Sequence, residues 1–314
     1  QIAPCFRDED PRADRAPGEF YQLDFEMSFA TDEDVYKVGE KVFYDVFSTF
    51  SDKYVSPAPF RRIKFKDAIL KYGSDKPDLR NPLIIEDISD IMGKSDFAPF
   101  KDTVVRCIKV ENIEKSNSWY KSMEEYVKGI HGNLGYIQVK EGMELKSSLT
   151  KFMSDEVKNE LIEKMNLHEN DALFIVADKN RCARIMGNLR TKLGQELDLI
   201  DKNRYEFCII NDFPFYEENE ETGAIEFSHN PFSMPKGGLD ALNNKNPFEI
   251  EAFQYDFVCN GYEMASGGVR NHSPEILKKA FELVGYGEDI VRSKFPSLYE
   301  AFKYGAPPHA GMAP

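Results

Sequence analysis

The sequence predicts an α+β fold in which an antiparallel sheet is flanked by helices and a second α+β unit is inserted into the chain. Three observations point to it. Residues 19–29 alternate between polar and apolar side chains, as a half-buried antiparallel strand does. Residues 97–197 alternate between strand-like and helix-like segments, and Asn260-Gly261 separates two β-rich runs. With 314 residues, of which 41% are hydrophobic and 13% aromatic, the chain is long enough for two domains and too apolar to be disordered.

Residues 1–30 are predicted to form two strands joined by a charged loop. In the second strand one face is polar and carries Gln22, Asp24, Glu26 and Ser28. The opposite face is apolar and carries Tyr21, Leu23, Phe25, Met27 and Phe29. We expect the apolar face to be buried and the polar face to contact water or to serve a function.

Two helices are predicted next. The first begins at Thr31, because Thr31 and Asp34 have the spacing of a capping box, and its apolar stripe runs from Val35 to Phe50. A shorter helix is expected at Phe65–Tyr72, and a polar loop follows it.

Residues 97–197 are predicted to be a domain of their own, inserted between residues 1–96 and residues 198–314. Within it, strands are expected at Val104–Val110, Leu134–Val139 and Ala172–Ala177, each followed by an amphipathic helix. The two flanking segments then form one domain from both ends of the chain. Strands return there at Tyr205–Asn211 and Phe253–Ala265, and two helices close the chain.

The segment Tyr255–Arg270 is the most informative. Asn260-Gly261 predicts a two-residue type I′ hairpin, because both central residues of that turn need positive φ. The predicted register pairs Val258 with Glu263, Phe257 with Met264, and Asp256 with Ala265. It therefore places Asp256, Val258, Glu263 and Ala265 on one face, and Tyr255, Phe257, Cys259, Tyr262 and Met264 on the apolar reverse.

Asp256 and Glu263 become diagonal neighbours in this register, with backbones roughly 7–8 Å apart. Two carboxylates at that separation suit a hard divalent cation such as Mg²⁺ that also contacts phosphate oxygens. Spacing alone is equally consistent with two acids that face solvent on an ordinary sheet.

Arg270 follows the pair Gly267-Gly268. Strict alternation would turn Arg270 to the apolar face, where an unpaired guanidinium is costly. Either the strand ends there, or a glycine bulge resets the register and turns Arg270 to the side of the carboxylates. The second alternative gives a face with two acids and one arginine, suited to a substrate that carries phosphate and carboxylate groups.

Near the N-terminus, Arg7 and Glu9 are expected to share one side of a strand. The guanidinium fork matches phosphate oxygens, but Arg7 among acids is also consistent with a plain ion-pair ladder. The following loop, residues 10–18, is long and charged, as functional loops often are.

Composition excludes several classes of protein. The formal net charge is −14, which argues against non-specific coating of nucleic acid, and no apolar run approaches the length of a membrane span. The five cysteines are scattered without a CxxC pair, which indicates reduced thiols and a cytoplasmic location. The acidic run 217–221 is expected to be a solvated loop without a function.

Taken together, these segments resemble the class II aminoacyl-tRNA synthetases, in the form of the bacterial-type aspartyl-tRNA synthetases. QIAPCFRDEDPRADRAPGEFYQLDFEMSF is similar to motif 2 of that family. The further matching segments, in the family's order, are YGSDKPDLR (72–80), FSHNPFSMP (227–235), YDFVCNGYEMASGGVR (255–270) and KYGAPPHAGMAP (303–314). Residues 97–197 resemble the GAD-type domain that bacterial enzymes insert between motifs 2 and 3. The resemblance implies the class II antiparallel sheet.

The resemblance also implies an activity: aspartate and ATP react to aspartyl-adenylate and pyrophosphate, and the aspartyl group is transferred to the 3′ end of tRNA(Asp), with tRNA(Asn) as an open second acceptor. By position, Arg7 matches the arginine that holds the α-phosphate, and Glu9 the acid beside ATP. Asp256 and Glu263 match the acids that bind Mg²⁺ on ATP. Arg270 matches the arginine that binds the aspartate side chain.

Further matches line the amino-acid site. Asp24 matches the acid near the substrate ammonium, with Gln22 and Glu26 on the same floor. His229 matches the substrate-loop histidine, although a plain loop histidine would look the same. Two departures from the family pattern are Asn230, where a second histidine is common, and an inserted Gly18 in the motif 2 loop.

The family's anticodon-binding barrel, its dimer-forming motif 1 and the GxDR of motif 3 have no counterpart in the 314 residues. We therefore expect the chain to be the central part of a longer enzyme, from motif 2 to just before GxDR, that is a homodimer when complete and inactive as this piece. The alternative is a non-catalytic fragment or paralogue that binds tRNA or another partner.

Overall fold

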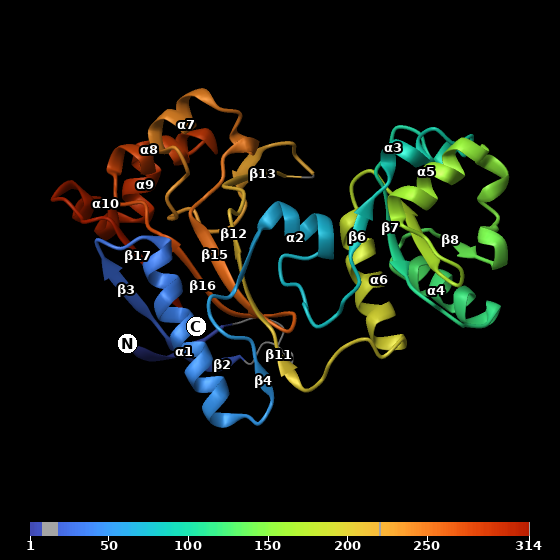
Figure 1. The fold of residues 1–314 in the computed structure, drawn as a ribbon. Coiled ribbons are helices and arrows are strands. Elements are labelled where there is room, and N and C mark those ends of the chain that lie inside the picture. Colours follow the sequence, from blue (N-terminus) through green and yellow to red (C-terminus); the bar gives the residue numbers. More distant parts are fainter. Residues whose placement is uncertain (8–17, 220, 314) are drawn as a thin grey trace. The chain divides into compact units, whose positions relative to one another are not determined.

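The structure, a computed structural model, describes residues 1–7, 18–219 and 221–313. The chain divides into two compact units. Unit 1 combines Gln1–Lys66 with Asn203–Pro314, and unit 2 is Asp67–Lys202 (Figure 1). The prediction of one unit inserted into another agrees with this division. The mixed content of helices and antiparallel strands agrees with the predicted α+β class.

Unit 1 is built around a six-stranded sheet with the strand order β3-β17-β16-β15-β12-β5, antiparallel except for the parallel pair β12 and β5. The sheet strands are β3 (Phe25–Ser28), β5 (Arg61–Lys64), β12 (Phe207–Asn211), β15 (Gln254–Cys259), β16 (Tyr262–Val269) and β17 (His309–Ala313). The shorter strands are β1 (Ile2–Phe6), β2 (Glu19–Leu23), β4 (Tyr54–Val55), β11 (Arg204–Tyr205), β13 (Tyr216–Glu218) and β14 (Ile225–Phe227). The helices are α1 (Asp32–Phe50), α2 (Phe65–Tyr72, which leads into unit 2), α7 (Gly238–Asn244), α8 (Pro274–Leu283), α9 (Glu288–Lys294) and α10 (Pro296–Lys303).

Helix α1 packs on one face of this sheet. The predicted capping box is present, because the Thr31 backbone N–H and hydroxyl both donate to Asp34 Oδ2, at 3.0 and 2.8 Å. Val35 and Phe43 are buried against the sheet, in one cluster with Phe257 and Met312. The predicted apolar stripe is only partly buried, since Val38 and Val46 are exposed whereas Phe47 packs against the core. Its last member, Phe50, is 84% exposed.

The predicted strand at residues 19–29 is in fact two strands that belong to different sheets. β2 forms a two-stranded sheet with β1, whereas β3 pairs with β17. Phe25 and Met27 pack against the core beneath α1, as expected. Tyr21 is 77% exposed and Leu23 37% exposed, so the expectation of a continuous buried face is wrong for β2.

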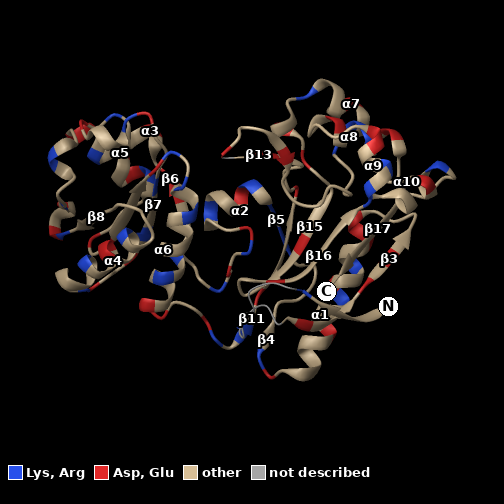
Figure 2. Ribbon diagram, turned by 180° about the vertical axis from the view of Figure 1, so that it is seen from behind, with Lys and Arg blue, Asp and Glu red and all other residues tan. Residues whose placement is uncertain are grey.

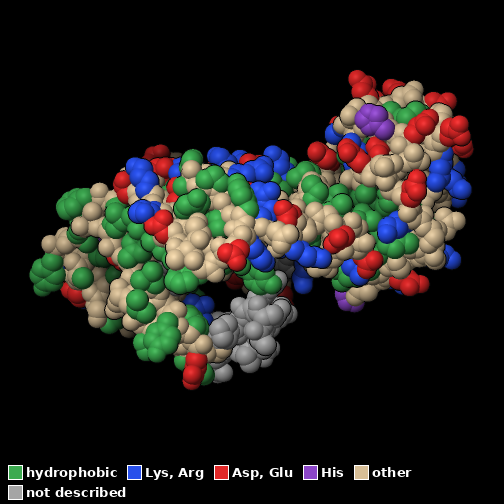
Figure 3. All heavy atoms as spheres, turned by 60° about the horizontal axis from the view of Figure 1, so that its bottom comes forward, with side chains coloured by type: hydrophobic (Ala, Val, Ile, Leu, Met, Phe, Trp, Pro, Cys, Tyr) green, Lys and Arg blue, Asp and Glu red, His purple; other side chains and the backbone are tan. Residues whose placement is uncertain are grey.

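The β1–β2 hairpin thus presents an exposed apolar face. The register places Ile2 opposite Leu23 and Pro4 opposite Tyr21, so these side chains lie on the same side as Phe6. Ile2 and Phe6 are 70% and 71% exposed. Figure 3 shows hydrophobic side chains at several places on the surface that faces the viewer.

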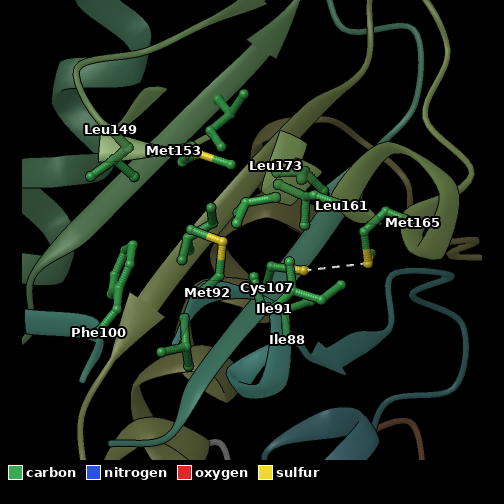
Figure 4. Close-up of a cluster of buried hydrophobic side chains, with 14 of the residues drawn as sticks. Ile88, Ile91, Met92, Phe100, Cys107, Leu149, Met153, Leu161, Met165 and Leu173 are labelled. Carbon is green, nitrogen blue, oxygen red and sulfur yellow. Dashed lines mark hydrogen bonds between the residues drawn. The ribbon is translucent and has the colours of Figure 1, made fainter. Parts of the chain in front are cut away.

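Unit 2 has a five-stranded antiparallel sheet, with the strand order β6-β7-β10-β8-β9, between two layers of helices. Its strands are β6 (Ile85–Asp87), β7 (Val105–Val110), β8 (Leu134–Val139), β9 (Leu145–Lys146) and β10 (Ala172–Ala177). Its further helices are α3 (Ser89–Met92), α4 (Asn117–Gly129), α5 (Asp155–Met165) and α6 (Cys182–Glu196). Alternate residues of each central strand point to opposite layers, for example Leu173 to α5 and Phe174 to α4 and α6. Figure 4 shows the hydrophobic cluster on the α5 side of the sheet, in which Cys107 Sγ lies 3.7 Å from Met165 Sδ.

The predicted start of the inserted domain at residue 97 is wrong, since unit 2 begins at Asp67. β6 is the edge strand of the unit 2 sheet, where it pairs with β7. The loop before β6 is also tied to α6, because a Cβ at Gly73 would lie 2.5 Å from Gly187. The buried guanidinium of Arg190 donates to Leu83 O at 2.6 Å and to Asn81 O at 2.6 Å. Residues 67–96 therefore share the core of the insertion.

Candidate functional site

The sheet face opposite α1 carries four of the predicted polar side chains, those of Glu26, Asp256, Glu263 and Arg270. At its centre is the β15–β16 hairpin, whose turn residues Asn260 and Gly261 have φ of 54° and 89°. The predicted type of turn is confirmed by these two positive values. The Asn260 side chain also fixes the turn, since it accepts from Glu206 N at 2.9 Å and donates to Arg204 O at 3.0 Å.

The predicted register is correct only next to the turn. Val258 pairs with Glu263 as expected, but Phe257 pairs with Ala265, and Asp256 with Ser266. A β-bulge at Met264 inserts one extra residue, so the pairs Phe257–Met264 and Asp256–Ala265 were wrong by one position. Ala265 consequently lies with Phe257 in the core under α1 and not beside Asp256.

The bulge decides the orientation of Arg270. Because Asp256 is opposite Ser266, the later residues Gly268 and Arg270 lie on the face of Asp256. The sequence had left open whether a bulge or the end of the strand resolves the alternation. A bulge does so, at Met264 and not at the glycine pair.

The glycine pair has a different role, which is close packing between strands. A Cβ at Gly267 would lie 2.4 Å from Gly311 O and 2.4 Å from the Tyr255 ring. A Cβ at Gly268 would lie 3.0 Å from Ser233 Oγ and 3.0 Å from Phe253 O. Side chains at either position would push β16 away from its neighbours.

Asp256 and Glu263 share this face but differ in exposure. Asp256 is 4% exposed, whereas Glu263 is at the exposed start of β16. The described residues contain no group of three or more His, Cys, Asp or Glu side chains arranged to hold a metal ion. Figure 2 shows acidic positions on β15 and on β3, both strands of this sheet.

Arg270 is paired with an acid that the sequence analysis placed only on the floor of the site. Its Nε and Nη2 donate to Glu26 Oε1 at 2.9 and 2.5 Å, across 244 residues of sequence. The Arg270 side chain is 21% exposed and the Glu26 side chain 49% exposed. No local pattern could have revealed this pair, because Glu26 lies on β3 and Arg270 directly follows β16, and β17 separates these two strands.

His229 lies in the loop that follows β14 in unit 1. Its ring packs edge-on against Phe213, with centroids 4.9 Å apart, and against Phe65 at 6.0 Å. The neighbouring Asn230 accepts from Phe232 N at 2.9 Å, so its side chain is used to shape the loop.

Sequence reasoning missed a cluster of charged side chains next to these aromatic residues in the sequence, since Lys64 precedes Phe65 and Asp212 precedes Phe213. Asp212 is bound by Lys236 and by Lys64, the latter at 3.1 Å. Burial of Asp212 favours the neutral acid, but the hydrogen bonds from Lys236 and Lys64 outweigh it and lower the pKa of the carboxyl. No sequence pattern reveals this cluster, because Lys64 and Asp212 come together only when β5 pairs with β12 in the folded sheet.

The remaining predicted residues lie on or beside the β1–β2 hairpin. Arg7 is exposed, and its guanidinium stands 5.4 Å from the centre of the Phe20 ring. The Gln22 amide oxygen accepts from Cys5 Sγ at 3.6 Å, and Asp24 is partly buried at the junction of β2 and β3. Glu9 lies outside the described residues.

Among the described residues, no helix has both the length and the apolar character needed to cross a membrane.

Comparison with known proteins identifies the family of the chain. The chain matches the family "tRNA synthetases class II (D, K and N)" over residues 1–314. It is 51% identical to the "Aspartate--tRNA(Asp/Asn) ligase" of Rickettsia canadensis (strain McKiel) and to that of Rickettsia akari (strain Hartford), over 100% of this chain and 54% of each relative. The chain thus spans about half the length of these relatives. A solved structure, "Aspartyl tRNA synthetase from Entamoeba histolytica", aligns with 99% of this chain and 42% of its own, at 18% identity and a TM-score of 0.43, too low to establish more.

Because the family match covers every residue and these relatives are half identical over the same length, the chain belongs to the class II tRNA synthetases of the D, K and N group.

Proposed function

We propose that this chain is the central part of an aspartate–tRNA ligase. The complete enzyme would activate L-aspartate with ATP and transfer the aspartyl group to the 3′ end of tRNA(Asp), with tRNA(Asn) as a second acceptor to be tested. The observation that carries the proposal is a buried acid, Asp256, and a paired arginine, Arg270, on one face of the unit 1 sheet of a class II chain. Relatives at 51% identity are named as ligases for aspartate.

Arg270 is proposed to bind the side-chain carboxylate of aspartate. A planar guanidinium fork donates to both oxygens of a carboxylate, whereas the amide of asparagine offers one acceptor and one donor. The site would therefore reject asparagine by leaving a donor opposed to a donor. Asp24, Gln22 and His229 are proposed to contact the ammonium and carboxylate groups of the same substrate.

ATP is proposed to lie along the same face, with Arg7 on its α-phosphate and Glu9 beside it. Asp256 and Glu263 are the residues that would hold Mg²⁺. Carboxylate oxygens are the ligands that Mg²⁺ prefers in proteins. The bound ion would neutralise charge on the triphosphate.

The residues of this chain would accelerate adenylate formation by position and charge. The α-carboxylate of aspartate is already a nucleophile, so no general base is needed. Arg270 and Asp24 would orient that nucleophile, and Arg7 would stabilise negative charge that develops on the α-phosphate oxygens.

We further propose that unit 2, residues 67–202, is the GAD-type domain and that the complete enzyme is a cytoplasmic homodimer. The support for the domain is its self-contained antiparallel sheet and two cores. The dimer and the location rest on the resemblance to the family.

The test is pyrophosphate exchange with the natural chain that contains these residues, with L-aspartate, L-asparagine and L-lysine as separate substrates. Exchange should depend on aspartate and be lost in Arg270→Ala. Charging of purified tRNA(Asp) and tRNA(Asn) then decides the acceptor range. Exchange with none of the three amino acids would contradict the proposed function and favour a non-catalytic binding role.

A further inference from the structure

We propose that Glu26 is a positioning residue that holds Arg270 by one edge of its guanidinium and presents the other edge to a carboxylate ligand. The inference rests on the proposed function and adds to it a residue that determines specificity.

The contacts divide the guanidinium into a used edge and an open edge. Nε and Nη2 of Arg270 both donate to the same oxygen, Glu26 Oε1. A guanidinium has five N–H donors, so this contact leaves both donors of Nη1 and one of Nη2. Within the described part of the chain, Nη1 has no hydrogen-bond partner. Of the three remaining donors, one on Nη1 and the one on Nη2 form the end-on fork that matches a carboxylate.

The backbone is shaped so that the two side chains can meet. Glu26 on β3, Gly311 on β17 and Gly268 on β16 are opposite one another in one row across three strands. A Cβ at position 311 would lie 2.5 Å from Glu26 Cδ and 2.7 Å from Glu26 Oε2. The two glycines therefore keep the row free of side chains, and Glu26 lies across Gly311 toward Arg270.

Holding the arginine in advance has two consequences for a ligand. A free arginine loses rotamer freedom when it binds, whereas one already fixed by Glu26 loses less, so the ligand binds more tightly. A fixed fork also has a fixed direction, so an amide cannot avoid the clash of its NH₂ group with the donors. Glu26 thus serves affinity for aspartate and discrimination against asparagine, although it donates nothing to the substrate.

The experiment compares Glu26→Gln with the wild-type chain in aspartate-dependent pyrophosphate exchange. The substitution keeps the size of the side chain and removes its charge. We expect the KM for aspartate to rise at least about tenfold, while kcat and the KM for ATP stay within about twofold. The ratio of kcat/KM for aspartate over asparagine should fall, and Glu26→Asp should restore part of the loss.

Glu33→Gln is the matched control. Glu33 also forms an ion pair with an arginine, Arg62, in unit 1, and its side chain is similarly exposed, at 51%. All kinetic constants of this variant should equal those of the wild type. If Glu26→Gln does not fold, Glu26→Ala provides a second removal of the carboxylate.

The outcomes separate the two proposals. If the wild type catalyses exchange and the aspartate KM of Glu26→Gln is unchanged, only the proposed role of Glu26 is contradicted, and the proposed function stands. A lowered KM contradicts it as well, since Glu26 would then compete with the substrate. Absence of exchange in the wild type overturns both the proposed function and the positioning role.

Discussion

Replacing Arg190 by methionine should destabilise unit 2 and leave unit 1 unchanged. Arg190 is 2% exposed and sits on α6, where it donates to Leu83 O, Asn81 O and Asp78 O at 2.6, 2.6 and 3.0 Å. Its guanidinium also lies 5.0 Å from the centre of the Tyr72 ring. All of these partners belong to the segment that the sequence analysis had assigned to the other domain.

Two opposing effects set the magnitude. Three hydrogen bonds from a charged donor contribute about 1.5–3 kcal/mol each, so their loss costs about 4–9 kcal/mol. Burial lowers the pKa of Arg190 from 12.5 to about 10, which corresponds to a desolvation cost of about 3 kcal/mol that methionine does not carry. The net loss of unfolding free energy is therefore about 1–6 kcal/mol, a large share of the stability of a domain.

Urea unfolding followed by tryptophan fluorescence measures this loss selectively. The chain has one tryptophan, Trp119, and it lies on α4 within unit 2. The control is Arg181→Met, which removes an exposed ion pair with Asp178 one residue before α6 and should change stability by less than about 0.5 kcal/mol. A loss below about 1 kcal/mol in Arg190→Met would refute the reasoning, because the buried carbonyls would then not depend on the guanidinium.

Two further substitutions test unit 1. Gly311→Ala would place a Cβ 2.2 Å from Phe25 O and should cost about 1–3 kcal/mol in urea unfolding, whereas Gly129→Ala, with open space around it, should cost nothing. The lowered pKa of Asp212 means that the unfolded chain binds more protons in acid, so this carboxylate stabilises the fold above about pH 4 and loses that effect as the pH falls through its folded pKa. Asp212→Asn should therefore be less stable than the wild type at pH 7 and equally stable near pH 2. The control is Asp198→Asn, at a side chain that is 82% exposed, and its stability should match that of the wild type at every pH. A loss of stability in Asp212→Asn that is the same at all pH values would contradict this assignment.

Local signals in the sequence predicted local structure well. Phe65–Tyr72, Leu134–Val139 and Ala172–Ala177 form with the predicted bounds, because each combines a clear periodicity with a recognisable end. β17 was not predicted. Its residues, His-Ala-Gly-Met-Ala, lack the β-branched and aromatic side chains typical of strands, and its place between β3 and β16 depends on close packing over glycines.

The site was predictable in composition and less so in geometry. The acids and the arginine could be assigned to one hairpin from the Asn-Gly turn. The bulge at Met264 has no sequence signature, and it decides which residues face Asp256. The partner of Arg270 depends on the order of strands in the sheet, and strand order is set by the whole chain.

The domain boundary was misplaced for a related reason. β6 has three residues, too few for a periodicity, and it joins the unit 2 sheet through backbone pairing with β7. Gly73, Asn81 and Leu83 contact α6, which lies a hundred residues further along the chain.

The insertion of unit 2 also affects how the chain reaches its fold. β5 ends at Lys64 and β12 begins at Phe207, yet the two strands pair in parallel. Bringing the ends of such a long flexible loop together costs about 4 kcal/mol of chain entropy. Folding of unit 2 replaces most of that loop by a compact body and removes most of this cost. The sheet that carries Asp256 therefore gains its edge strand β5 more readily after unit 2 has folded. Unit 2 thus assists assembly of the site although it contributes no residue to it.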